Sequence, residues 1–425
     1  MTIINSSKAS SLLSKRGILR TLFLLSLFIL APISASAATY YVAPNGSNSN
    51  PGTQAAPFAT LQKGHDVAVA GDTIYMRGGT YTLSTYVNIN RSGSSGNPIK
   101  VFNYPGETPV LDAINITTSY WSVIQLSNAS WWHFKGLELK NGPAQGLVLS
   151  GDSSNNIVEF NNVHHNTRVQ SSGSGIAVSD TSANNLILNN DSHHNGVPGT
   201  SGGDGIGVTP QPQVTGNVVR GNRVWRNNDD GIDLWNAANV LIENNWSWQN
   251  GYNDALQPSG GNGNGFKLGG AGPSDGKHTV KNNLSWRNLV DGFHETGGDL
   301  PITLYNNTAW NNGRQSFTFF NGATTFRNNI SFGSLGSISG SDTFNSWTLG
   351  VTVSAVDFSS LDDTCARGPR QADASLPNCS FLHLASGSDL IDRGVKVGSA
   401  YVGSAPDLGA YEDGGSETPP VRSSS

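Results

Sequence analysis

The segment Val219–Leu234 reads VRGNRVWRNNDDGIDL and contains the two patterns that decide the fold. In the first pattern an apolar residue precedes Asn222 by three positions, and the ring of Trp225 follows that Asn by three. In the second pattern, Gly231–Leu234, a Gly is followed by alternating apolar residues, directly after Asp229-Asp230. Both patterns recur along the chain, so the segment represents one turn of a repetitive structure.

The first pattern occurs seven times, and its shortest intervals are 22–24 residues. This period is too short for a helix pair and is typical of one coil of a parallel β-helix, in which equivalent residues stack about 4.8 Å apart. We therefore expect ladders of buried Asn side chains at the turns. The anchoring residues are Asn161, Asn190, Asn222, Asn245, Asn283, Asn307 and Asn329.

Composition agrees with an all-β, single-stranded parallel β-helix. The chain contains 51 Gly, and only 13% of its residues are charged, which favours short strands and many turns over salt-bridged helices. Phe58–Ala68 has helical spacing, and a short helix before a β array is expected to cap its end. The longest intervals between anchors predict long loops on one face.

The N-terminus predicts export. Basic residues precede the apolar run Leu22–Leu30, and Ala35-Ser36-Ala37 offers a cleavage site. That run is too short for a membrane anchor. We expect a signal peptide at 1–37, a catalytic β-helix domain at 38–412 and a disordered polar tail at 413–425, in a secreted monomer without membrane association after signal removal.

The charge of the chain bears on which partners it can bind, and its two cysteines bear on metal binding and disulfide formation. Removing residues 1–37 deletes Lys8, Lys15, Arg16 and Arg20 and no acidic residue, so the mature chain is more acidic than the formal −5 of the whole sequence. No Lys/Arg cluster indicates nucleic acid. Cys365 and Cys379 fit neither a redox pair nor a zinc site, so in an exported protein we expect a structural disulfide between them.

Rings stand three positions after each anchor. The first two are His164 and His193, each followed by a second His, which suggests a metal site. Because Trp and Phe fill the same position in later coils, ring stacking explains His164 and His193 better. The sequence leaves open whether this ladder faces into or out of the coil.

The second pattern predicts an acidic site. Strand alternation turns its apolar positions inward and aligns Gly207, Asp233, Lys267 and His294 in an outward column. Asp204 and Asp230 share the preceding position in neighbouring coils. Asp204, Asp229, Asp230 and Asp233 should therefore converge, and carboxylate oxygens are the ligands that Ca²⁺ prefers. Lys267 follows Asp233 in the column. Asp291 and His294, one coil further, are weaker candidates for sugar contacts.

Lys267 beside a Ca²⁺ site on an exported β-helix indicates an enzyme acting on acidic polysaccharides. A metal ion can neutralise a uronate carboxylate and acidify the neighbouring C–H, and a neutral Lys amine can accept that proton. Since free Lys has a pKa near 10.4, we expect an alkaline optimum.

These residues resemble the polysaccharide lyase family 9 pectate lyases. The resemblance rests on Gly203–Ile206, Asn228–Trp235 and Gly263–Gly270. It implies a right-handed parallel β-helix that cleaves polygalacturonate by Ca²⁺-dependent β-elimination and yields unsaturated oligogalacturonides. It also implies Asp204, Asp229, Asp230 and Asp233 as Ca²⁺ ligands and Lys267 as the catalytic base.

Three alternatives stay open at this stage. A lyase acting on rhamnogalacturonan or alginate would use the same Ca²⁺ and Lys. A glycoside hydrolase would need two carboxyl groups and leave Lys267 without a role. A non-catalytic adhesin or carbohydrate-binding β-helix would use the Asp cluster only for structure.

Overall fold

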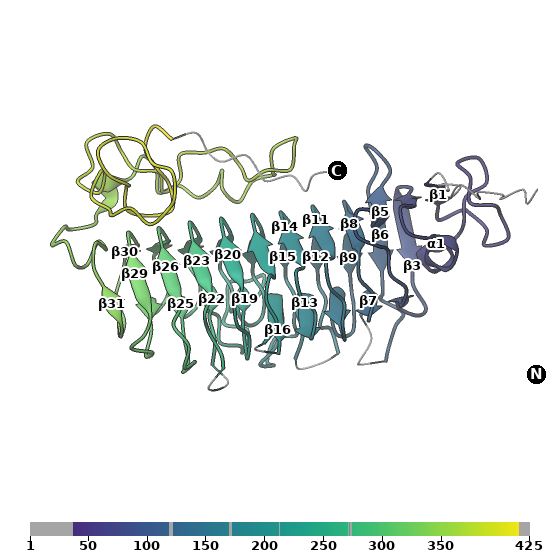
Figure 1. The fold of residues 1–425 in the computed structure, drawn as a ribbon, viewed down its shortest axis with the longest axis horizontal. Coiled ribbons are helices and arrows are strands. Elements are labelled where there is room, and N and C mark those ends of the chain that lie inside the picture. Colours follow the sequence, from purple (N-terminus) through teal and green to yellow (C-terminus); the bar gives the residue numbers. More distant parts are fainter. Residues whose placement is uncertain are drawn as a thin grey trace, which may run out of the picture. The chain divides into compact units, whose positions relative to one another are not determined.

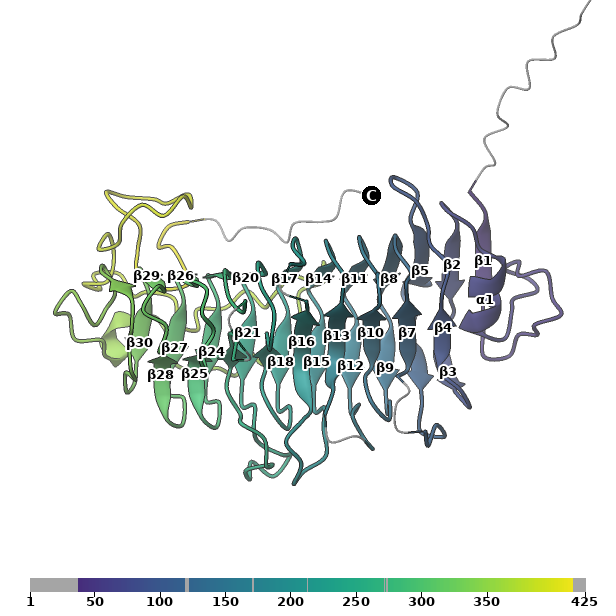
Figure 2. The same cartoon turned by 60° about the horizontal axis from the view of Figure 1, so that its bottom comes forward.

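The computed structural model describes residues 37–118, 122–169, 172–211, 213–270, 272 and 274–415. Apart from Ala37, the predicted signal peptide lies outside these ranges, as do residues 416–425 of the predicted tail. Within the described residues, parallel strands stack in three long sheets that wind around a common interior (Figures 1 and 2). The predicted parallel β-helix is confirmed.

Sheet A begins at the N-terminal end and alternates with the other two sheets along the chain. Its strands are β1 (Thr39–Val42), β2 (Thr73–Met76), β5 (Ile99–Asn103), β8 (Trp132–Lys135), β11 (Ile157–Glu159), β14 (Leu186–Leu188), β17 (Val218–Arg220), β20 (Leu241–Glu243), β23 (Thr279–Lys281), β26 (Thr303–Tyr305), β29 (Thr325–Arg327) and β31 (Ser341–Asp342).

Sheets B and C complete each coil. Sheet B contains β3 (Gly79–Thr82), β6 (Pro109–Asp112), β9 (Glu138–Lys140), β12 (Asn162–His164), β15 (Asp191–His193), β18 (Arg223–Trp225), β21 (Trp246–Trp248), β24 (Leu284–Trp286), β27 (Thr308–Trp310) and β30 (Ile330–Phe332). Sheet C contains β4 (Val87–Ile89), β7 (Ile124–Ser127), β10 (Leu147–Ser150), β13 (Ser174–Asp180), β16 (Asp204–Pro210), β19 (Ile232–Asp233), β22 (Phe266–Lys267), β25 (Asp291–His294) and β28 (Gln315–Thr318).

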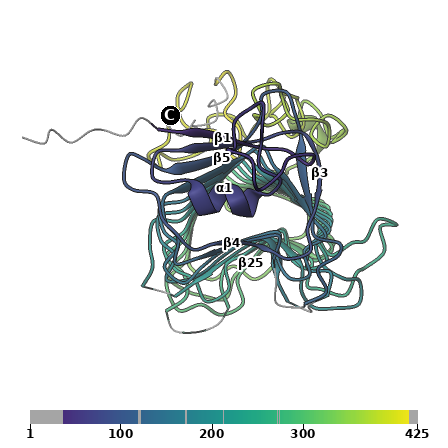
Figure 3. The same ribbon diagram turned by 90° about the vertical axis from the view of Figure 1, so that its right-hand side faces the viewer.

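Helix α1 (Leu61–Val67) covers the N-terminal end of the coil, as Figure 3 shows from that end. The Thr60 side chain accepts a hydrogen bond from the Lys63 backbone N–H and caps the first turn. Leu61 and His65 are buried against the first strands. The predicted capping helix is thus present, and it shields the apolar interior from solvent at this end. No helix among the described residues is long and apolar enough to cross a membrane.

The predicted Asn ladder joins sheets A and B. The Nδ2 of Asn222 donates to Oδ1 of Asn245 at 3.0 Å, and the same bond repeats from Asn161 through Asn329. Each of these residues is almost completely buried, so the bonds satisfy polar groups that would otherwise destabilise the interior. Asn345 adds one rung beyond the last predicted anchor.

The ring ladder faces outward on sheet B, which resolves the question that the sequence left open. His193, Trp225, Trp248 and Trp286 stack with centroids 4.1–4.9 Å apart. A C-terminal arm, residues 349–411, covers the later rings, and Phe381 packs against Trp286 and Trp310. The ladder is therefore a second apolar core outside the coil.

The expected Cys365–Cys379 disulfide is wrong for this structure, in which both described cysteines are thiols. The Cys365 sulfur lies 3.8 Å from the carbonyl oxygen of Asn378, so the two segments are adjacent without an S–S bond. The arm is held in other ways. Arg370 and Arg223 both pair with Asp191, and the Trp286 indole N–H donates to Asp363.

Candidate metal and catalytic site

The outward column of sheet C has the predicted register. Gly207 pairs with Asp233, Asp233 with Lys267, and Lys267 with His294 in successive strands. The alternating positions turn inward, where Ile206, Ile232, Phe266 and Phe293 are completely buried. The inward residues fix the strand register, because a slip of one residue would move the charged column into the core.

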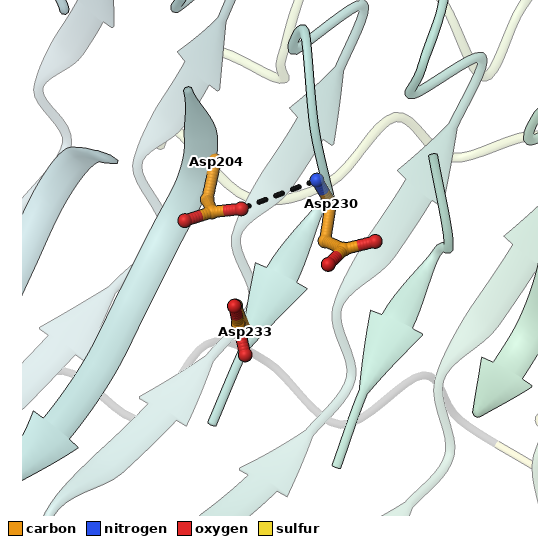
Figure 4. Close-up of side chains that lie close together, drawn as sticks. All are labelled: Asp204, Asp230 and Asp233. Atoms are coloured by element: carbon orange, nitrogen blue, oxygen red, sulfur yellow. Dashed lines mark hydrogen bonds between the residues drawn. The ribbon is translucent and has the colours of Figure 1, made fainter. Parts of the chain in front are cut away.

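Three carboxylates converge at the start of this column (Figure 4). One oxygen from each of Asp204, Asp230 and Asp233 lies within 4.8 Å of the other two. Asp204 begins β16, Asp230 stands in the turn before β19, and Asp233 ends β19. Oδ1 of Asp204 also accepts a hydrogen bond from the Asp230 backbone N–H at 3.2 Å. Two stacked coils thus contribute to a single cluster.

Asp229 lies outside this group of three. Its Oδ1 accepts a hydrogen bond from the backbone N–H of Asn262, at 2.5 Å, in the loop between β21 and β22. The structure therefore brings together three of the four residues predicted as ligands. The contribution of Asp229 stays a prediction.

The donor set of the cluster fits a hard cation. Asp233 Oδ1 and Asp230 Oδ2 are buried and accept no hydrogen bond from the described residues, although the Lys267 ammonium lies 3.3 Å from Asp230 Oδ2. Burial and the neighbouring carboxylates raise the pKa of Asp204 well above its ordinary value. Burial and the charge of Asp230 raise the pKa of Asp229 to about 7. Burial also raises the pKa of Asp233 to about 6, since burial and the charge of Asp230 outweigh the opposing charge of Lys267. A bound Ca²⁺ would relieve this crowding of like charges.

Lys267 is buried beside the cluster. Its Nζ lies 3.0 Å from Asp233 Oδ2, 3.3 Å from Asp230 Oδ2 and 5.0 Å from the centre of the Trp235 ring. Burial disfavours the ammonium form, but the charges of Asp233 and Asp230 outweigh burial and raise the pKa of Lys267. The ammonium therefore supplies the positive charge that the carboxylates require in this structure.

Two long loops hold the acidic turn in place. Asn228 Nδ2 donates to the backbone carbonyls of Thr200 and Gly202 in the loop before β16. From the loop before β22, the Asn264 backbone N–H and side-chain Nδ2 both donate to Asp230 Oδ1, at 2.8 and 2.9 Å. Sequence reasoning missed Asn228 and Asn264 as positioning residues. Their place beside the Asp motifs was the only available signal.

Asp291, one coil beyond Lys267, binds Arg314 from the coil that follows it. Asp291 Oδ2 is 2.8 Å from His294 Nδ1 and 2.5 Å from Arg314 Nη2. Burial opposes ionisation of Asp291, but the hydrogen bonds from Arg314 and His294 prevail and lower its pKa to about 2. Arg314 directly precedes β28, two coils beyond Lys267, and its side chain is 54% exposed.

The chain has relatives of known class. The family profile described as "Pel9A-like, right handed beta helix region" matches residues 40–329. Pectate lyase L of Dickeya chrysanthemi is 34% identical over 397 residues, which cover 88% of this chain and 90% of that protein.

Two solved structures extend the comparison. The crystal structure of pectate lyase Pel9A matches with a TM-score of 0.78 and 32% identity, over 89% of this chain and 97% of that one. A rhamnogalacturonan lyase matches with a TM-score of 0.69 and 28% identity, over 82% and 97% of the two chains. The chain therefore belongs to the Pel9A-like right-handed β-helix family of polysaccharide lyases, as its motifs predicted.

Proposed function

We propose that this protein is a secreted pectate lyase that cleaves polygalacturonate by Ca²⁺-dependent β-elimination and releases unsaturated oligogalacturonides. The observation that carries the proposal is the placement of Lys267 one strand beyond Asp233, beside three converging carboxylates. The names of the pectate lyase relatives support the substrate. Export rests on the pattern of residues 1–37.

Asp204, Asp230 and Asp233, with Asp229 at their edge, would hold the Ca²⁺. When bound, the ion supplies a positive charge that neutralises a uronate carboxylate and acidifies the C5–H next to it. Asn264 keeps Asp230 oriented through its two hydrogen bonds, and Asn228 keeps the acidic turn against the neighbouring loop. The chain thus presents preorganised oxygen ligands, which costs no rearrangement during the reaction.

Lys267 Nζ is the proposed general base. The neutral amine accepts the C5 proton, the C4–O4 bond breaks, and the C–H electron pair becomes the C4=C5 double bond. The glycosidic oxygen leaves with the electrons of its bond and takes a proton from water. Because Asp233 and Asp230 raise the pKa of Lys267, the neutral amine is scarce near neutral pH, and activity should increase into the alkaline range.

A lyase acting on rhamnogalacturonan is the second candidate, because a protein of that name matches over most of the chain. The same carboxylates and Lys267 would serve that reaction. The choice between the two depends on which uronate polymer enters the site.

The test is ultraviolet absorbance of the unsaturated product during incubation with polygalacturonate, rhamnogalacturonan or alginate, each with Ca²⁺ and with excess chelator. We expect absorbance to grow on polygalacturonate and to stop on chelation. Growth only on rhamnogalacturonan would transfer the proposal to that polymer. Cleavage without the unsaturated product, or cleavage that survives chelation, would overturn the mechanism.

A further inference from the structure

Two His-His pairs lie one above the other on the outer face of sheet B, away from the Asp cluster on sheet C. His164 ends β12 and His193 ends β15 in the next coil, and His165 and His194 follow them directly. The rings of His164 and His193 stack with centroids 5.0 Å apart, and those of His165 and His194 with centroids 5.4 Å apart. The predicted stacking is present, but it does not explain how the rings meet within each pair.

Within each pair the two Nδ1 atoms point at each other. They are 2.7 Å apart in His164–His165 and 2.5 Å apart in His193–His194, with ring planes at 83° and 84°. A contact this short needs either a proton or a cation between the two nitrogens.

The other ring nitrogens fix where the protons are. His193 Nε2 lies 2.9 Å from Asn162 Oδ1, and His194 Nε2 lies 2.9 Å from Asp254 Oδ1. With the Asn162 amide oriented as it is here, both oxygens accept hydrogen bonds, so both Nε2 atoms carry hydrogen. A neutral imidazole has one N–H, and the two Nδ1 atoms therefore present lone pairs to each other.

In the His164–His165 pair, His164 Nε2 lies 3.3 Å from Glu138 Oε1 and therefore also carries hydrogen. Protonation of one ring does not remove this repulsion between the two Nδ1 lone pairs near neutral pH. Burial and the neighbouring imidazoles lower the pKa of His193 well below its ordinary value, and burial is the main cause that lowers the pKa of His194 to about 4.

We propose that the His193–His194 pair, with His164–His165 stacked beside it, binds a divalent transition-metal ion such as Zn²⁺ through the converging Nδ1 atoms. Ligating imidazoles usually donate their other N–H to a carboxylate or carbonyl, as Asp254 and Asn162 allow here. A Zn–N bond of about 2.0–2.1 Å at a tetrahedral angle places two ligands of one ion about 3.3 Å apart, so each pair would open by roughly 0.6–0.8 Å on binding.

The site differs in chemistry from the Asp cluster. Imidazole nitrogen suits Zn²⁺, Cu²⁺ and Ni²⁺, whereas Ca²⁺ prefers oxygen. His165 is exposed and His194 partly so, which leaves the ion a path from solvent. The two sites lie on different sheets, so we expect the transition-metal ion to be dispensable for the lyase reaction.

The test is a Zn²⁺ titration of the full-length, untagged protein, first stripped with chelator and then saturated with Ca²⁺ to occupy the Asp cluster. Competition with a colorimetric chelator gives the affinity and stoichiometry. We expect one Zn²⁺ per chain. Absence of Zn²⁺ binding, or binding only at millimolar Zn²⁺, would overturn the proposal.

Matched variants locate the ion. His165 and His194 have positive φ angles of 55° and 53°, and Asn311 takes the same turn position, with φ 51°, in a later coil. His194→Asn therefore keeps the turn and removes one ligand, and we expect it to weaken Zn²⁺ binding at least tenfold. Asp254→Asn keeps all four rings and should weaken binding about tenfold by freeing the His194 tautomer.

Arg226→Asn is the control, because Arg226 occupies the same turn position one coil further and has no imidazole. We expect its Zn²⁺ affinity and the Ca²⁺-dependent lyase activity of all three variants to match wild type. Unchanged Zn²⁺ affinity in His194→Asn, with melting temperatures confirming the fold, would contradict the site.

Discussion

The same coils carry two outward columns of opposite character. On sheet B, Trp225, Trp248 and Trp286 stack and are covered by the C-terminal arm. On sheet C, the equivalent coils place Asp233 and Lys267 outward, under loops that bury their charges. The first column does what folding favours, because it removes apolar surface from water. The second keeps buried charge together at a cost to stability.

This difference indicates where function resides. An unsatisfied carboxylate oxygen such as Asp233 Oδ1 destabilises the folded protein unless a ligand binds it. The raised pKa of Asp204 has the same meaning, because folding disfavours its charged form. A column that opposes folding is retained for binding or chemistry, whereas a column that supports folding needs no other reason.

The largest effect should come from Lys267→Ala. If Lys267 is the base, the variant should lose about 10³-fold in kcat, within the range of about 10²–10⁴ usual for a general base. The measurement is the initial rate of ultraviolet absorbance on polygalacturonate at saturating Ca²⁺. Lys281→Ala is the control, because Lys281 pairs with Glu243 on sheet A, away from the site. A folded Lys267→Ala protein with near wild-type kcat would remove the mechanism.

The complementary change on sheet B is Trp286→Ala. Trp286 is completely buried between Trp248 and Phe381, so truncation should lower the free energy of unfolding by about 3–5 kcal/mol. Denaturant unfolding measures the loss, with Trp286→Phe as the milder control. We expect the kcat of the folded variant to be unchanged. A large loss of kcat in protein shown to be folded would mean that the two columns are coupled.

The sequence repeat made most of the arrangement of the two columns predictable. Asn anchors at intervals of 22–24 residues fix the coils, and strand alternation then fixes the register that sets Lys267 beside Asp233. The convergence of Asp204 and Asp230 follows from their equivalent positions in neighbouring coils.

Residues outside the repeat were not predictable in the same way. Asp229 lies outside the group of three, and its carboxylate accepts a hydrogen bond from the Asn262 backbone N–H in an insertion without periodicity. The arm that covers Trp286 has no repeat, so no pattern in residues 349–411 indicates which face of the coil it covers. The disulfide prediction failed because the number and spacing of cysteines do not fix the distance and orientation that an S–S bond requires.

Calcium should act on one column only. An ion that binds the folded protein alone stabilises it by about 2.7 kcal/mol at 100 times its dissociation constant. We expect chelation to lower the melting temperature of wild type and to have little effect on Asp204→Asn, which loses one ligand. Trp286→Phe, changed on the other face, should keep the full response to Ca²⁺. An equal response in wild type and Asp204→Asn would place the ion elsewhere.

The smallest expected effect is on the pH dependence of stability, which should differ between the two columns. In Ca²⁺-free protein, the raised pKa values of Asp233 and Asp229, about 6 and about 7, mean that the folded state holds more protons than the unfolded state. The stability from these groups is complete below their unfolded pKa of about 3.9 and is lost as pH rises through about 6–7.

Asp191, beneath the arm, should respond in the opposite direction. Burial opposes its ionisation, but the charges of Arg370 and Arg223 outweigh burial and lower its pKa. Its contribution is therefore present above the unfolded pKa of about 3.9 and is lost as pH falls through the lower folded value.

Melting temperatures of the chelated protein from pH 3 to 8.5 should decline at both ends. Asp233→Asn should flatten only the neutral limb and Asp191→Asn only the acid limb, each by a few degrees, since one pKa unit corresponds to about 1.4 kcal/mol. If Asp233→Asn left the neutral limb unchanged, the electrostatic cost assigned to the sheet C column would be wrong, whatever the role of Lys267 in the reaction.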